Sequence, residues 1–255
     1  MEIITSLQNS KVKLTKGLQS RARTRRKERK IVLEGTRLIR DAIEHKHKPL
    51  FVIYEKQSAN QDLIALLESE DIELMPVNDE VLLYLSETPH PQGVIGVFPL
   101  PVPHMLRKPA TVLILDTIRD PGNLGTILRT AAAAGVQVVI LSPGCADPYN
   151  PKTLRSGMGA HFRIPIIEAT WENIEGYCQS LNVYLATGKG DLPYDQADWQ
   201  SSWALIIGNE AHGAGDESAN IASSNIFIPM DTETESLNAA VATGVILFEA
   251  ARHKR

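Results

Sequence analysis

Four polar side chains near the end of the chain have types and positions that suit chemistry: Asn209, Glu210, Ser236 and Asn238. Residues 204–207 form a short apolar run that ends in Gly208, which is typical of a buried strand followed by a tight turn. A second apolar run covers 226–230, and Ser236 has a suitable side chain for the N-cap of a following helix. Because open α/β sheets bind ligands outside the carboxyl ends of their strands, the pattern predicts a ligand site here.

The elements around these residues alternate between strands and helices. Apolar runs predict strands over 111–116, 137–141 and 183–187. A turn at 121–125 opens a helix that Gly135 closes, and a second helix is expected over 171–181. The last helix should bury one apolar face, whose residues recur at helical spacing: Leu237, Ala240, Val241, Gly244, Phe248 and Ala251.

Three blocks of this half resemble one family. GNEAHGAG at 208–215 and IPMDTETESLNAAVA at 228–242 are similar to the second and third motifs of the SpoU (TrmH-like) RNA ribose 2′-O-methyltransferases. NLGTILRTAAAAGV at 123–136 is similar to the first motif. This family belongs to the SPOUT superfamily, which binds S-adenosylmethionine. Three blocks in the right order make the resemblance specific, and it implies a carboxyl-terminal trefoil knot and a homodimer. Whether the partner chain completes the site stays open.

The resemblance implies a set of catalytic candidates: Asn123, Arg129, Glu210, Ser236 and Asn238. From spacing alone Arg129 is a surface or ion-paired arginine, and Glu210 could be a turn carboxylate that accepts nearby N–H groups. The family favours Arg129 for activation of the ribose hydroxyl. A guanidinium keeps its proton, however, so we expect it to hold the ribose or phosphate and stabilise the developing alkoxide. Both roles stay open.

The resemblance also implies contacts to S-adenosylmethionine at strand ends and at the start of the last helix. The cofactor-binding candidates are Thr187, Gly188, Gly208, Asn209, Glu210, Ile228, Met230 and Leu237. Glycines after a strand let a backbone approach a ligand, although an ordinary turn is as common. The spacing of Gly122 and Gly125 does not match a GxGxxG fingerprint, which disfavours a dinucleotide-dependent oxidoreductase.

The first forty residues are strongly basic. They hold twelve Lys and Arg against three Glu, a net charge of +9, so the other residues carry −13 of the total of −4. A basic arm on an acidic body favours a polyanionic partner such as RNA, with a solvated helix face as the alternative. Arg155 matches a family position near the active site, where phosphate contact and a salt bridge are both open. The RNA-binding candidates are Arg21, Arg23, Arg25, Arg26, Lys27 and Arg155.

The chain is expected to be an α/β protein in two parts. EGTRLIRDAI and HPQGVIGVF resemble the small ribosomal-protein-like substrate-binding domain of many SpoU enzymes. Residues 1–100 are therefore assigned to an RNA-binding α/β domain, 101–110 to a proline-rich linker and 111–255 to the SPOUT methyltransferase domain. Before its first strand the basic arm, 7–30, should be one helix that is broken, if anywhere, at Gly17.

The composition is that of an ordinary globular protein. No apolar run is long enough for a membrane span, the two cysteines form no disulfide framework, and no histidine spacing suits a metal. We therefore expect a cytoplasmic enzyme without metal that methylates a ribose 2′-hydroxyl, most readily in ribosomal RNA. The alternatives are a transfer RNA methyltransferase and a catalytically silent RNA-binding factor on the same fold.

Overall fold

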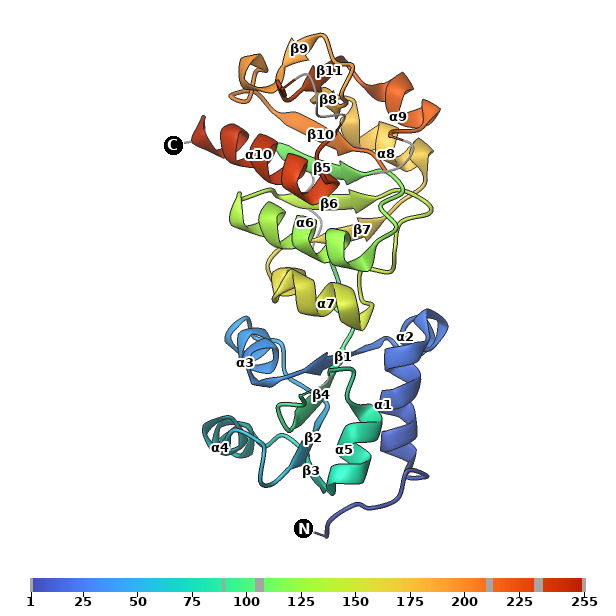
Figure 1. Cartoon of the computed structure of the whole chain (residues 1–255), viewed down its shortest axis with the longest axis vertical. Helices are drawn as coiled ribbons and strands as arrows, with labels where there is room; N and C mark the ends of the chain where they lie inside the picture. Colours follow the sequence, from blue (N-terminus) through green and yellow to red (C-terminus); the bar gives the residue numbers. More distant parts are fainter. Residues whose placement is uncertain (1, 89, 104–107, 210–212, 232–235, 254–255) are drawn as a thin grey trace. The chain divides into compact units, whose positions relative to one another are not determined.

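The computed structural model describes residues 2–88, 90–103, 108–209, 213–231 and 236–253. The chain forms two compact units (Figure 1). The first unit holds Met1–Pro101 together with Tyr149–Phe162, and the second holds Val102–Pro148 together with Arg163–Arg255. The chain therefore passes from one unit to the other after Pro101, Pro148 and Phe162.

The first unit is a four-stranded sheet with helices on both faces. β1 (Lys30–Glu34) pairs antiparallel with β4 (Val94–Pro99), which pairs antiparallel with β2 (Phe51–Glu55), and β2 runs parallel to β3 (Leu74–Val77). Residues alternate along β1, so that Ile31 and Leu33 enter one core while Val32 enters the other. The helices are α1 (Ser10–Ser20), α2 (Ala22–Glu28), α3 (Thr36–Glu44), α4 (Gln61–Ser69) and α5 (Asp79–Leu85).

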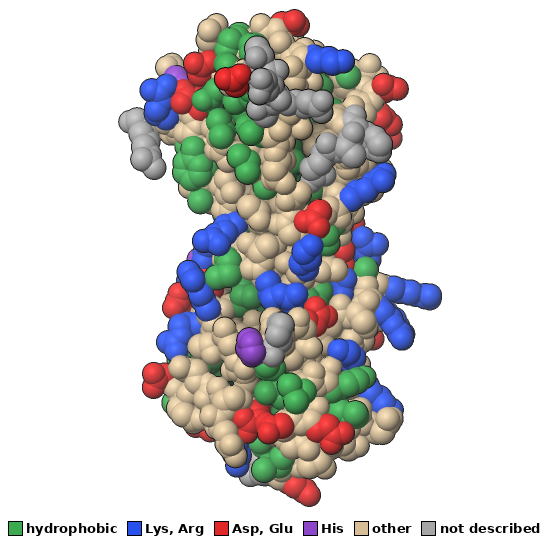
Figure 2. Space-filling view, in the orientation of Figure 1, with side chains coloured by type: hydrophobic (Ala, Val, Ile, Leu, Met, Phe, Trp, Pro, Cys, Tyr) green, Lys and Arg blue, Asp and Glu red, His purple; other side chains and the backbone are tan. Residues whose placement is uncertain are grey.

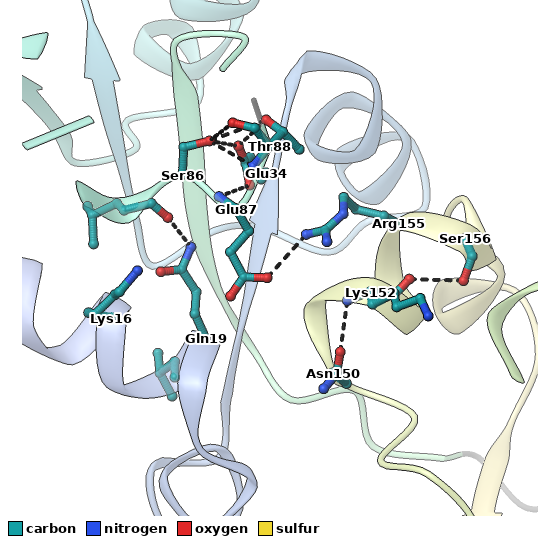
Figure 3. Close-up of polar contacts among 12 residues, drawn as sticks. Lys16, Gln19, Glu34, Ser86, Glu87, Thr88, Asn150, Lys152, Arg155 and Ser156 are labelled. Atoms are coloured by element: carbon teal, nitrogen blue, oxygen red, sulfur yellow. Dashed lines mark hydrogen bonds and ion pairs between the residues drawn. The ribbon is translucent and has the colours of Figure 1, made fainter. Parts of the chain in front are cut away.

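A helix from the middle of the chain completes this unit. α7 (Pro151–Gly157) follows an Asn150 cap, whose side chain accepts the Lys152 N–H at 2.9 Å (Figure 3). Leu154 on this helix is buried in the core beside α3 and α4. The following short 3₁₀ turn, Ala160–Phe162, places the Phe162 ring 6.4 Å from that of Phe98. Residues 149–162 thus supply core to the first unit.

The second unit is a seven-stranded sheet in which every recorded pairing is parallel, and the strand order is β7-β6-β5-β10-β8-β11-β9. β5 and β10 are fully buried along their length, which explains their uninterrupted apolar sequences. The strands are β5 (Thr111–Leu115), β6 (Val138–Leu141), β7 (Ile166–Glu168), β8 (Asn182–Ala186), β9 (Leu192–Pro193), β10 (Trp203–Ile207) and β11 (Ser224–Phe227). The helices are α6 (Pro121–Ala133), α8 (Trp171–Cys178), α9 (Asp216–Ile221) and α10 (Ala239–Arg252), with a 3₁₀ turn at Tyr194–Gln196.

The predicted α/β class is confirmed, but two expected helix boundaries are wrong. Gly17 stays inside α1, and the basic arm breaks instead at Arg21, whose backbone is extended with φ −135°. The last helix begins at Ala239 with Asn238 as its N-cap, not at Ser236. Asn238 is the N-cap because its side-chain carbonyl oxygen accepts hydrogen bonds from the N–H groups of Ala240 and Val241. β7, β9 and α9 are too short to leave a periodic pattern, and the sequence did not predict them.

The expected apolar face of α10 is also wrong. Its buried residues are Ala239, Ala240, Thr243, Ile246, Leu247 and Ala250. Val241 and Phe248 are 53% and 52% exposed, and Val245 is 36% exposed. α10 packs along α6, where Gly244 lies beside Thr130, and Ile246 and Leu247 are buried while Val241, Val245 and Phe248 face outward. None of the helices in the described ranges has both the length and the apolar character needed to cross a lipid bilayer.

Candidate active site

A cavity of about 260 Å³ opens in the second unit where three neighbouring strands end. The residues after β8, β10 and β11 form three of its sides, and the start of α10 forms the fourth. It is lined by Ala186, Thr187, Gly188, Ile207, Gly208, Asn209, Gly213, Ala214, Ile226, Phe227, Ile228, Met230, Ser236, Leu237, Ala239, Ala242 and Ile246. The site therefore lies at the carboxyl edge of the parallel sheet, as the strand pattern predicted.

The residues expected to contact the cofactor meet in this cavity. Those that line it are Thr187, Gly188, Gly208, Asn209, Ile228, Met230 and Leu237. Ser236, expected among the catalytic residues, also lines it. Glu210 lies outside the described residues. The structure brings these side chains and backbone segments together from distant parts of the sequence, while their roles stay predictions.

The turn after β10 forms a tight wall of the cavity. Asn209 and Gly213 exchange two backbone hydrogen bonds of 2.9 Å, which close the turn at its base. The Asn209 side chain donates from Nδ2 to the carbonyl oxygen of Thr117, 2.7 Å away. A Cβ on Gly208 would lie 2.5 Å from the backbone nitrogen of Ala214, so no larger residue fits there without moving the wall.

The first and third motifs meet through two asparagines. Nδ2 of Asn238 lies 3.2 Å from Oδ1 of Asn123, near the amino-terminal ends of α10 and α6. Because Oδ1 of Asn238 already caps α10, this amide joins one helix start to the other. Asn123 itself is held by the Asp120 cap, whose carboxylate accepts its N–H at 2.8 Å. These contacts fix the polar groups at the amino-terminal end of α10.

Arg129 stands apart from the cavity lining. It lies on the exposed face of α6, six residues after Asn123, which is about 9 Å further along the helix axis. Within the described part of the chain its guanidinium makes no hydrogen bond or ion pair. Among the described catalytic candidates, Arg129 therefore makes no such contact with Asn123, Ser236 or Asn238, and Glu210 lies outside the described residues.

The basic arm divides into exposed and buried arginines. Arg21, Arg23, Arg26 and Lys27 are exposed, and Figure 2 shows Lys and Arg side chains projecting where α2 lies in Figure 1. Arg25 is only 4% exposed, and its guanidinium donates to the carbonyl oxygens of Leu18 and Gln19. The geometry corrects the expectation for Arg25, because a group that caps the end of α1 is not presented to RNA.

Arg155 lies on α7 in the first unit. Its Nη1 is 3.4 Å from a carboxylate oxygen of Glu87, and both side chains are about one-third exposed (Figure 3). The segment around Glu87 is itself ordered by Glu34, which accepts hydrogen bonds from Ser86, Thr88 and the Glu87 N–H. The salt bridge left open by the sequence is thus present, and an RNA contact by Arg155 stays a prediction.

Sequence reasoning missed the buried polar residues behind the cavity wall. Asp116 is 2% exposed and accepts hydrogen bonds from Gly215 and Ser218, and Ser142 lies beside it. The available signal was a carboxylate directly after an entirely apolar strand, a place where burial without partners would be costly. Among the described residues, no group of three or more His, Cys, Asp or Glu is placed to hold a metal ion.

The fold and this site define a class of protein. The sequence matches the model of the SpoU rRNA methylase family over residues 110–248, which is more than half of the chain. A model of the MRM3-like substrate binding domain matches residues 9–96. The chain belongs to the SpoU rRNA methylase family, and the resemblance seen in its motifs is confirmed.

Individual relatives match along almost the whole chain. A Bacillus subtilis protein named 23S rRNA (guanosine(2553)-2′-O)-methyltransferase RlmP is 33% identical, with 97% of this chain and 98% of that protein covered. Mouse mitochondrial rRNA methyltransferase 3 is 34% identical over 91% of this chain and 69% of its own. The crystal structure of an AdoMet-bound rRNA methyltransferase from Sinorhizobium meliloti superposes with a TM-score of 0.85 at 33% identity, covering 99% and 98% of the two chains.

Proposed function

We propose that this protein transfers a methyl group from S-adenosylmethionine to a ribose 2′-hydroxyl of ribosomal RNA. The observation that carries the proposal is the convergence of three distant motifs on one edge of the sheet. The cavity joins the segments at 187–188, 208–209, 228–230 and 236–237, and the bond between Asn123 and Asn238 brings the first motif beside them. The named relatives, which are rRNA methyltransferases, support the same activity.

The lining of the cavity suits S-adenosylmethionine. Ile207, Ile226 and Ile246 offer apolar surface for a flat adenine ring. The backbone after three parallel strands, together with the side chains of Thr187 and Ser236, offers hydrogen-bonding groups for the ribose and the amino acid end. When bound, this sulfonium supplies an already reactive methyl group. The protein itself must then align the reactants, exclude water and help the 2′-hydroxyl to lose its proton.

The side chains divide that work between them. Asn238 caps α10 and bonds to Asn123, and with Ser236 these two residues would orient polar groups at the cavity edge. The Arg129 guanidinium holds the ribose or the adjacent phosphate and lowers the cost of the alkoxide as the proton leaves. Glu210 would orient these groups from the second motif. Thr187, Gly188, Gly208, Asn209, Ile228, Met230 and Leu237 would hold the donor.

The first unit would bind the RNA. Its match to a substrate-binding domain and the exposed Arg21, Arg23, Arg26 and Lys27 support contacts to phosphates. Arg155 would add a contact from α7. Several phosphate contacts suit a folded ribosomal RNA better than a short substrate, and the names of the relatives agree with this choice. We further propose that the enzyme works without metal in a reducing cytoplasm, which both unpaired cysteines support.

A homodimer and a knot belong to the same proposal. Val241, Val245 and Phe248 follow one another at helical spacing on α10 and form an exposed apolar face. Figure 2 shows hydrophobic side chains on the surface where α10 lies. A second copy of the chain would cover this face. The Arg129 guanidinium of that copy would then bind the ribose at the cavity of the first copy. The trefoil knot would arise from the crossing of the carboxyl-terminal segments around β10.

The decisive experiment compares Arg129→Ala with the intact protein. Ribosomal RNA from cells that lack the gene is incubated with the protein and radiolabelled S-adenosylmethionine, and the methylated ribose is mapped. We expect Arg129→Ala to lower turnover by about 10²-fold or more, because one stabiliser of the developing charge is lost. Calorimetry should give nearly unchanged affinity for S-adenosylhomocysteine. Glu172→Ala, which truncates an exposed side chain on α8 that does not line the cavity, is the control and should keep full activity.

Each other outcome points to a different function. Methylation of transfer RNA alone would favour the transfer RNA alternative. Binding of RNA without any affinity for S-adenosylmethionine would identify a silent RNA-binding factor. Loss of cofactor binding by a folded Arg129→Ala protein would refute the role given to that residue.

A further inference from the structure

Asp116 is a buried carboxylate that the reaction as described does not use. It follows β5 directly, and only 2% of the residue is exposed. Its Oδ2 accepts the Gly215 N–H at 2.7 Å and the Ser218 hydroxyl at 2.6 Å. Its Oδ1 lies 3.3 Å from the Ser142 hydroxyl. A charge buried this deeply is retained only where several donors compensate its lost hydration.

Thr117, the residue after Asp116, binds the turn that follows β10 at the end opposite Gly215. Thr117 has a φ of +54°, a backbone conformation that is unusual for a β-branched residue. In this conformation its carbonyl oxygen accepts Nδ2 of Asn209 at 2.7 Å, while its N–H donates to the Ser142 hydroxyl at 3.1 Å. Strained backbone persists where the surroundings determine it strongly, and here it brings one acceptor to Asn209.

Asp116 and Thr117 therefore hold two described segments of the cavity wall, residues 208–209 and residues 213–215. Asn209 is fixed at the start of the turn and Gly215 at its end. At and next to these two fixed residues, Gly208, Asn209, Gly213 and Ala214 line the cavity. The close approach of Gly208 to the Ala214 backbone leaves no slack in this wall. A shift of Gly215 would be carried directly to Ala214 and Gly213.

We propose that Asp116 is a positioning residue for the S-adenosyl donor, acting through the backbone of residues 208–209 and 213–215 without touching the donor. The inference rests on the proposed function, because it assigns the cavity to that donor. It predicts that the carboxylate controls donor affinity more than turnover. Once the donor saturates the site, the reacting groups supplied by Asn123, Ser236 and Arg129 are unchanged.

The test is Asp116→Asn, which keeps the shape of the side chain but replaces the carboxylate with a neutral amide, so that a single, weaker acceptor oxygen remains for Gly215, Ser218 and Ser142 together. We expect the Kd for S-adenosylhomocysteine to rise about 10- to 100-fold by calorimetry, because displacement of a binding wall by a fraction of an ångström has effects of this size. KM for S-adenosylmethionine should rise in parallel, with kcat at saturating donor changed far less. Hydrogen exchange at Gly213, Ala214 and Gly215 should become faster.

Two further variants keep the result decisive. Ser218→Ala removes one of the two donors to Oδ2 and should raise the Kd several-fold, so it decides the matter if Asp116→Asn does not fold. Asp198→Asn is the matched control, because that carboxylate accepts the Ser201 N–H and hydroxyl in a turn that contributes no residue to the cavity. Its Kd should equal that of the intact protein.

The outcomes separate this inference from the proposed function. If the intact protein binds no S-adenosylhomocysteine, the assignment of the cavity fails. If the intact protein binds it and folded Asp116→Asn and Ser218→Ala bind it equally well, the assignment stands and the role of Asp116 is refuted. Equal losses of kcat and affinity in Asp116→Asn would also overturn the positioning role.

Discussion

At the scale of single residues, Asn238 shows how one amide can serve the fold and the site together. Its carbonyl oxygen caps α10, and its N–H₂ group reaches Asn123 on α6. Removing the side chain would therefore uncap α10 and also remove the hydrogen bond to Asn123 at the cavity edge. A loss of activity in such a variant would not by itself identify a chemical role for Asn238.

The two cysteines should be poor nucleophiles in the folded protein. Burial, together with the smaller effect of the nearby Glu175 carboxylate, raises the pKa of the Cys178 thiol to about 11. At pH 8 the reactive thiolate is then roughly one part in a thousand. Burial also raises the pKa of Cys145, whose Sγ lies 3.2 Å from the Leu115 carbonyl oxygen.

We expect iodoacetamide at pH 8 to leave Cys178 unlabelled in the native protein and to label it fully in denaturant. Mass spectrometry of the digested protein measures both states. Because the raised pKa belongs to the folded state, native labelling should increase only as the pH rises toward 11. Rapid native labelling at pH 8 would contradict the burial of this thiol.

The positions of residues at the cavity, though not their roles, were predictable where the family resemblance names them. Thr187, Asn209 and Leu237, expected beside the cofactor, line one cavity. The family resemblance gave no means to separate Arg25 from its neighbours, because all are arginines in one basic run and only the packing of α1 against α2 buries the guanidinium. The buried hydrogen bonds of Asp116 were not predicted for a related reason: its partners Gly215 and Ser218 are about a hundred residues away in the sequence.

At the scale of elements, α10 presents two different faces. Ala239, Ala240 and Ala250 are buried, which lets the helix lie close to its neighbours. The opposite side carries Val241, Val245 and Phe248 in contact with solvent. Hydrophobic periodicity identified this helix but chose the wrong side, since the alternation of small and large residues does not say which partner each face meets.

Phe248→Asp should convert the proposed dimer to a monomer, because it places a charge in the middle of the apolar face of α10. Light scattering coupled to size exclusion at micromolar concentration measures the mass. Leu83→Asp, at a residue 62% exposed on α5 in the first unit, is the control and should leave the dimer intact. An intact protein that is already monomeric would refute the dimer, and a dimeric Phe248→Asp protein would refute this interface.

At the scale of the whole molecule, the units are not continuous in sequence. Alternating patterns were sufficient to predict the α/β class and the order of the longer strands. They did not assign residues 149–162 to the first unit, because an amphipathic turn such as α7 carries no mark of the core it will join. The domain limits of 1–100, 101–110 and 111–255 remain a proposal about function, alongside compact units with a different division.

Leu154→Ala should destabilise the first unit by about 2–5 kcal/mol, because it empties a fully enclosed position in that core. Native hydrogen exchange measures the effect, with faster exchange expected in β1 and β4 than in β5 and β10. Lys152→Ala on the exposed side of the same helix is the control and should change stability by less than about 0.5 kcal/mol. Equal protection of β1 in the two variants would show that α7 adds nothing to this core.

The return of the chain to its first unit sets an order for biosynthesis. A ribosome that has released β4 has delivered the four strands of the first sheet but not Leu154 or Phe162, which close its core. Residues 102–148, with β5, α6 and β6, emerge before that closure is possible. The nascent RNA-binding unit must therefore wait, with apolar surface uncovered, while the first part of the methylase sheet is already being translated.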